Sequence, residues 1–123
     1  MEEKKKYDLE DRLVEFSVMI IELSEKIKKN YAGNHLSNQI VRSGTSPALQ
    51  YSEAQAAESR TDFVHKLKIL LKELRDTKVN LRMLVIAKLI SDEYLISNAL
   101  SECDQLTAIF IKSIETEKRN SKQ

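Results

Sequence analysis

Apolar residues recur at steps of three and four along most of this chain, and this spacing constrains the fold more than any other feature. Residues spaced in this way lie on one face of an α-helix. The clearest series comprises Leu9, Leu13, Phe16, Ile20, Leu23 and Ile27. Further series comprise Phe63, Leu67, Leu70, Leu74, Leu81 and Val85, and then Leu95, Ala99, Cys103, Leu106, Phe110 and Ile114. The spacing therefore predicts long amphipathic helices.

Residues that interrupt helices are scarce, since the 123 residues include two glycines and one proline. A sheet would need more turn residues than this. We therefore predict an all-α fold of four helices, at about 8–30, 36–57, 60–89 and 95–118. We expect the tail at 119–123 to be frayed.

Local signals set the expected boundaries of these helices. Gly33 and Asn34 predict a short loop at 31–35, because both residue types tolerate the backbone that ends a helix. Pro47 lacks a backbone donor and predicts a kink or break near Ser43 to Ser46. The stretch from Ser59 to Asp62 fits a capping box that begins the third helix.

Four helices joined by short connections pack most simply as an antiparallel up-down four-helix bundle, here a single domain over residues 1–123. Cys103, the one cysteine, lies on an apolar face and is expected to be a core residue. The longest apolar run, Met83 to Ala87, is far shorter than the roughly 20 residues that cross a bilayer. No apolar stretch resembling a signal peptide follows Met1. We expect a cytoplasmic protein that does not bind membranes.

Two of the predicted helices carry a second apolar series on the side opposite the core. A monomer would expose both, and exposed apolar patches usually mark interfaces. We therefore predict that the chain forms a homo-oligomer through them. A wider core, or a fourth helix wrapped across that side, is the alternative. The candidate interface residues are Val14, Val18 and Ile21 in the first helix and Val79, Met83, Ile86 and Ile90 in the third.

The third helix is also basic, although the whole chain has a net charge of only +1. Eight basic and three acidic residues lie between Arg60 and Lys88. A basic row on one helix face can contact phosphates, so four residues are candidates for binding nucleic acid: Lys68, Lys72, Arg75 and Arg82. The alternative is a solvated face that pairs with acids on the first and fourth helices.

The sequence offers little for catalysis, a metal, a cofactor or a small-molecule substrate, and we expect none. Asp62 and His65 form one imperfect half of a di-iron helix motif. Arg60 and His65 resemble the Arg-x4-His element of HEPN ribonucleases, in which the pair activates a ribose hydroxyl and stabilises the phosphate. Ribonuclease activity through Arg60 and His65 is therefore kept as an alternative.

A longer stretch resembles a known family. It consists of Gln39 to Ala48 (QIVRSGTSPA), Tyr51 to Ala54 (YSEA), Ser59 to Phe63 (SRTDF), His65 to Ile69 (HKLKI) and Lys72 to Leu74 (KEL). It is similar to the four-helix-bundle proteins encoded within intervening sequences of bacterial 23S ribosomal RNA genes. This sequence departs from the family where Leu49 and Gln50 follow Ala48, since an asparagine often follows that alanine.

The resemblance implies a four-helix bundle that assembles into pentameric rings. It also implies a relation to the accessory protein of diversity-generating retroelements, which works with a reverse transcriptase and RNA. We therefore expect a non-enzymatic homo-oligomer that serves as an RNA-associated accessory factor. A protein-interaction scaffold that does not use nucleic acid is the alternative.

Overall fold

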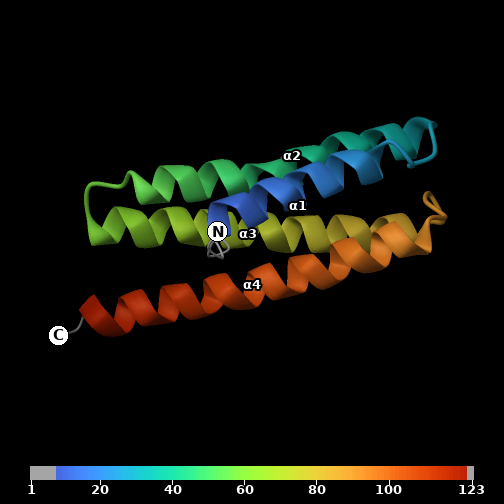
Figure 1. Ribbon diagram of the computed structural model, residues 1–123. Coiled ribbons are helices and arrows are strands. Elements are labelled where there is room, and N and C mark those ends of the chain that lie inside the picture. The colour runs from blue at the N-terminus through green and yellow to red at the C-terminus, as the bar shows by residue number, and fades with distance from the viewer. Residues whose placement is uncertain (1–7, 122–123) are drawn as a thin grey trace, which may run out of the picture.

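The computed structural model describes residues 8–121 and contains four helices and no strand within that range (Figure 1). The helices are α1 (Leu9–Ser24), α2 (Tyr31–Gln55), α3 (Arg60–Ile86) and α4 (Glu93–Ser121). Successive helices run in opposite directions (Figure 1). The predicted all-α antiparallel up-down four-helix bundle is therefore confirmed.

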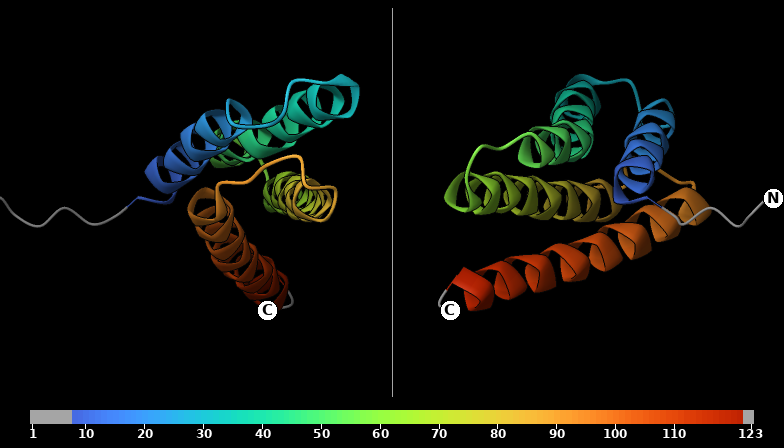
Figure 2. Two further views of the ribbon diagram at one scale, coloured as in Figure 1. Left: turned by 90° about the vertical axis from the view of Figure 1, so that its right-hand side faces the viewer. Right: turned by 60° about the vertical axis from the view of Figure 1, so that its left-hand side comes forward.

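The helices occupy the corners of the bundle in chain order, as the left view of Figure 2 shows. α2 packs extensively against both α1 and α3, α3 packs against α4, and α1 meets α4 over a smaller area. Within the described residues no Cα atom of α1 lies within 8 Å of a Cα atom of α3. The two helices lie at diagonal corners, so their outward sides point in different directions.

The junction of the first two helices differs from the prediction. α1 ends at Ser24, residues 25–30 are irregular, and α2 already begins at Tyr31, so the loop predicted at 31–35 is wrong. The Asn30 side chain accepts a hydrogen bond from the Gly33 amide at 2.8 Å and caps α2. Gly33 serves close approach rather than a turn, because a Cβ there would collide with the carbonyl oxygen of Lys28.

The break predicted before Pro47 is also wrong, because α2 runs without interruption through this residue. Pro47 is buried. The residues before it join α2 to its neighbours. Gly44 faces Ile20 of α1, whose Cγ2 would lie 2.8 Å from a Cβ at Gly44. On the other side Ser43 bonds to Thr77 of α3 at 2.9 Å. These contacts on both sides hold α2 together where the proline removes a backbone hydrogen bond.

The third and fourth helices begin and end at recognisable caps. Ser59 accepts from the Asp62 amide at 3.0 Å, which confirms the predicted start of α3. α3 ends at Ile86, not near residue 89, and Lys88 adopts the left-handed backbone with φ 58°. Asp92 accepts from the Leu95 amide at 3.1 Å at the start of α4. Residues 119–121 belong to α4 and are not frayed, whereas 122–123 lie outside the described residues.

The predicted apolar series form most of the core. Leu13, Phe16, Ile20 and Leu23 are almost fully buried, and so are Leu67, Leu70, Leu74, Leu81, Ala99, Cys103, Leu106 and Phe110. Val85 is an exception, because it is 44% exposed and Leu84 occupies the core instead. The stripe along α3 drifts around a helix of 3.6 residues per turn, which moves Val85 outward.

Candidate functional site

An apolar patch lies on the outward side of α3. Val79, Met83 and Ile86 are 49%, 40% and 75% exposed in the single chain, and we call these three residues the α3 face. Ile90, the fourth residue predicted for this stripe, does not lie on the helix, because α3 ends before it. It is half-buried against the core.

A second apolar patch lies on the outward side of α1. Val14, Val18 and Ile21 are 46%, 46% and 43% exposed, and we call them the α1 face. α4 covers neither face. Its main link to α1 is on another side of that helix, where Arg12 Nε lies 2.6 Å from Glu102 Oε2. The alternatives of a wider core or a wrapped fourth helix therefore fail.

Acidic side chains surround the α1 face, and sequence reasoning missed this feature. Three exposed acids share the outward side of α1 with the apolar residues, namely Asp11, Glu15 and Glu22, and the exposed Glu25 follows directly after the helix. Asp11, Glu22 and Glu25 have no ion-pair partner among residues 8–121. The helical spacing could have found this set, since 11, 15, 18, 22 and 25 again step by four and three.

The predicted basic row is exposed along the outward side of α3. Lys72 pairs with Asp76 of the same helix at 3.3 Å. Lys68, Arg75 and Arg82 have no ion-pair partner in the described part of the chain. Pairing with α4 involves other bases, such as Lys78 with Asp104 at 2.8 Å. Most of the predicted row is therefore free to meet another molecule.

A shallow basic pocket of about 340 Å³ lies at the start of α3, where Arg60, Thr61, Val64, His65 and Lys68 meet Lys118 of α4. The structure thus brings together the Arg60 and His65 pair and one member of the basic row. Arg60 Nε also lies 3.6 Å from Glu117 Oε1. Lys118 was not found from the sequence, because it lies on a different helix.

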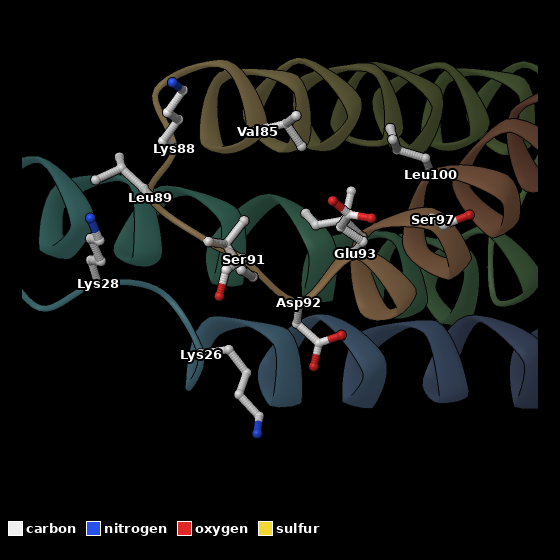
Figure 3. Close-up of a pocket in the computed structure, with 12 residues that line it drawn as sticks. Lys26, Lys28, Val85, Lys88, Leu89, Ser91, Asp92, Glu93, Ser97 and Leu100 are labelled. Atoms are coloured by element: carbon white, nitrogen blue, oxygen red, sulfur yellow. The ribbon is translucent and has the colours of Figure 1, made fainter.

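A larger cavity of about 720 Å³ opens at the end of the bundle where residues 25–30 and 87–92 lie (Figure 3). Its lining combines apolar side chains with three lysines, two acids and two serines. The residues are Lys26, Lys28, Val85, Lys88, Leu89, Ile90, Ser91, Asp92, Glu93, Ile96, Ser97 and Leu100. The two connections are joined, because the Lys28 amide donates to the Leu89 carbonyl oxygen at 2.8 Å.

The thiol and the acids do not form a reactive centre. Burial raises the pKa of Cys103 to about 12, and its Sγ lies 3.2 Å from the Leu74 carbonyl oxygen. The thiolate that a nucleophile or metal ligand needs is therefore strongly disfavoured. Within residues 8–121 no three His, Cys, Asp or Glu side chains group as metal ligands. None of the described helices has the length and apolar composition needed to cross a bilayer.

The family model of the 23S rRNA-intervening sequence protein matches residues 5–112. The chain belongs to this family. It is also similar to a crystal structure from Bacteroides thetaiotaomicron VPI-5482, named as a protein with unknown function from the S23 ribosomal protein family. The two chains are 32% identical with a TM-score of 0.78, and the match covers 87% of this chain and 98% of that one. Comparison with the curated proteins gives no match. Neither the family nor the similar structure is named for an enzymatic activity.

Proposed function

We propose that this protein is a non-enzymatic homo-oligomer that serves as an accessory factor for RNA in the bacterial cytoplasm. The observation that carries the proposal is the exposure of two separate apolar faces on one small bundle. The apolar surface of each face is removed from water only when another molecule covers it. Other copies of the chain are present wherever the protein is made, so a second copy is the simplest molecule to cover each face.

The test of self-association is the mass of the purified protein in solution at micromolar concentration, measured by light scattering. We expect an assembly of several copies. A ring of five is expected because the resemblance to this family implies assembly into pentameric rings. A monomer of 14.2 kDa at micromolar concentration would refute the proposal.

The RNA part of the proposal rests on the basic side of α3 and on the family. Lys68, Arg75 and Arg82 have no ion-pair partner among residues 8–121. An oligomer repeats this basic row in every copy and so strengthens its field. The resemblance to accessory proteins of diversity-generating retroelements supports RNA as the polyanion.

Binding to a structured RNA should weaken as salt rises, because phosphate contacts release counterions. Replacing Lys68, Arg75 and Arg82 together by alanine should weaken it strongly. Absent or salt-insensitive binding would contradict the RNA role, and capture of a protein partner by nuclease-treated material would favour a scaffold. Cleavage of the RNA that is lost in His65→Ala would favour the ribonuclease.

A further inference from the structure

We infer that copies of this chain pair head to tail, with the α1 face of one copy against the α3 face of the next. This inference rests on the proposed self-association and adds which surfaces meet. The occupant of each face is a second copy of the chain.

The position of the two faces favours this arrangement. α1 and α3 occupy diagonal corners of the bundle (Figure 2), so each copy can hold one neighbour on each side. A contact between two different surfaces of identical copies is heterologous, and repeating it closes into a ring when the rotation allows. A contact of one face with itself would stop at a dimer and leave the other face exposed.

The two faces also lie at nearly the same height along the bundle. α1 and α3 run in the same direction toward the end where their connections meet (Figure 1). There the Lys28 amide binds the carbonyl oxygen of Leu89, which is 61 positions later in the chain. The last helical residues, Ser24 and Ile86, are 62 positions apart. A residue of α1 therefore lies level with the α3 residue about 61 positions later. An error of one residue in this offset changes the height by about 1.5 Å.

In the arrangement that we infer, copies are related by a rotation about an axis parallel to the helices. Such a rotation leaves the height of each residue unchanged, so the same offset relates α1 of one copy to α3 of the next. The apolar residues then match: Val18 is level with Val79, and Ile21 is within a residue or two of Met83. Both faces span seven positions, about 10 Å of helix. Apolar surface would thus meet apolar surface.

The charges match at the same heights. Asp11 is level with Lys72, and Glu15 is within a residue of Arg75. Further along the helices, Glu22 is within a residue of Arg82, and Glu25 and Lys88 follow shortly after the ends of α1 and α3. Glu15 and Lys72 have partners within one copy, whereas the other charges of this set have no ion-pair partner among residues 8–121. Acidic rows would therefore meet basic rows beside the apolar contact, which steers association and fixes register.

The same charges oppose the competing contacts. Two α1 faces would bring acids against acids, and two α3 faces would bring bases against bases. Such juxtaposition of like charges penalises the wrong pairing. The charge pattern thus favours the head-to-tail contact over either symmetric dimer.

The test uses two full-length variants that each block one face. Val14→Lys places a positive charge level with Arg75 of one neighbouring copy. Met83→Glu places a negative charge level with Glu22 of the other neighbouring copy. Each change therefore brings like charges together across the contact. Both sites are exposed in the single chain, so the bundle should fold. The introduced charges lie about 12 Å apart in height and should not form a new pair. We expect each variant alone to be monomeric and an equimolar mixture to form a species that contains both.

Leu49→Lys on α2 is the matched control, since Leu49 is 65% exposed but lies on neither face. It should keep the mass of the unmodified protein, and circular dichroism should show that all variants are folded. If either blocked variant still assembled alone, and mixing added nothing, the head-to-tail pairing would be wrong while self-association stood. A monomeric unmodified protein would overturn both.

Discussion

The hydroxyls of Ser43 in α2 and Thr77 in α3 form a buried hydrogen bond of 2.9 Å. Thr77 Oγ1 also lies 2.8 Å from the Glu73 carbonyl oxygen. Without the Thr77 hydroxyl, Ser43 keeps only its long bond of 3.5 Å to the Ile40 carbonyl oxygen and is left poorly satisfied in a buried place. Thr77→Val should therefore lower the free energy of unfolding by about 1 to 2 kcal/mol. Urea denaturation measures this change.

The matched control for this pair is Thr45→Val, because the one bond of the Thr45 hydroxyl among residues 8–121 is to the Val41 carbonyl oxygen of its own helix. It should cost less than Thr77→Val. The double variant Ser43→Ala/Thr77→Val should cost less than the sum of its single changes, since it leaves no unpaired hydroxyl at the site. Additive costs would show that the bond contributes nothing of its own.

The contact between Gly44 and Ile20 predicts a second effect on stability. Alanine normally favours a helix over glycine by about 1 kcal/mol. Here the new Cβ would lie 2.8 Å from Ile20 Cγ2, so the Ile20 side chain must move or α1 and α2 must separate. We expect Gly44→Ala to destabilise the protein by about 1 to 3 kcal/mol. Urea denaturation measures it, with the exposed Asn38→Ala as a control that should be neutral or stabilising.

The cause can be tested with Ile20→Ala, which removes the atoms in the way. Gly44→Ala should cost less in the Ile20→Ala background than in the original protein, by about 0.5 kcal/mol or more. If Gly44→Ala stabilised the protein, close approach of the two helices would not explain the glycine.

The fold was predictable because its main determinant is periodic and local. Leu13, Phe16 and Leu74 follow the helical spacing, and burial of that stripe is what a bundle requires. The start of α3 was predictable for the same reason, since Ser59 caps through its own neighbours. The loop at 31–35 was wrong because the capping of α2 by Asn30 and the tight contact of Gly33 outweigh the preference of Gly33 and Asn34 for turns.

The candidate surfaces were predictable only in part. The apolar residues of the α1 face and the basic row of α3 each follow from spacing on one helix. Their relation does not, because it depends on the diagonal positions of the helices and on the bond between Lys28 and Leu89. The basic pocket likewise needed the structure, since Lys118 reaches Arg60 and His65 from another helix.

The buried thiol of Cys103 predicts a pH dependence of stability. Burial raises its pKa from the ordinary value of 9.0 to about 12. Above pH 9 the thiol loses its proton in the unfolded chain but keeps it in the folded one, so the unfolded state binds fewer protons. Stability should therefore fall as pH rises from 9 toward 12, by at most about 1.4 kcal/mol per pH unit, and be unaffected below that window. Urea midpoints between pH 8 and 10.5 measure this slope.

Other groups also titrate in that range, so the control is Cys103→Ala measured at the same pH values. This variant should be less stable at pH 7, because it leaves a small cavity. Its stability should fall less steeply above pH 9 than that of the original protein. Equal slopes would mean that the thiol ionises in the folded protein as easily as in the unfolded chain.

Head-to-tail pairing divides the basic row of α3 into two parts with different effects on RNA. Arg75 and Arg82 flank the contact between copies, whereas Lys68 lies beside the basic pocket with Arg60 and Lys118. Lys68→Ala/Lys118→Ala removes two bases of the pocket, and should leave the assembly's mass unchanged and weaken RNA binding. Its slope of log K against log salt should become shallower by about 1.4, the value for two lost phosphate contacts on a single strand.

Arg75→Ala/Arg82→Ala should first lower the mass of the assembly, with RNA binding falling as the assembly dissociates. Lys29→Ala/Lys112→Ala removes the same charge from exposed sites elsewhere and should change neither. Equal effects of all three double variants would mean that net charge alone governs RNA binding.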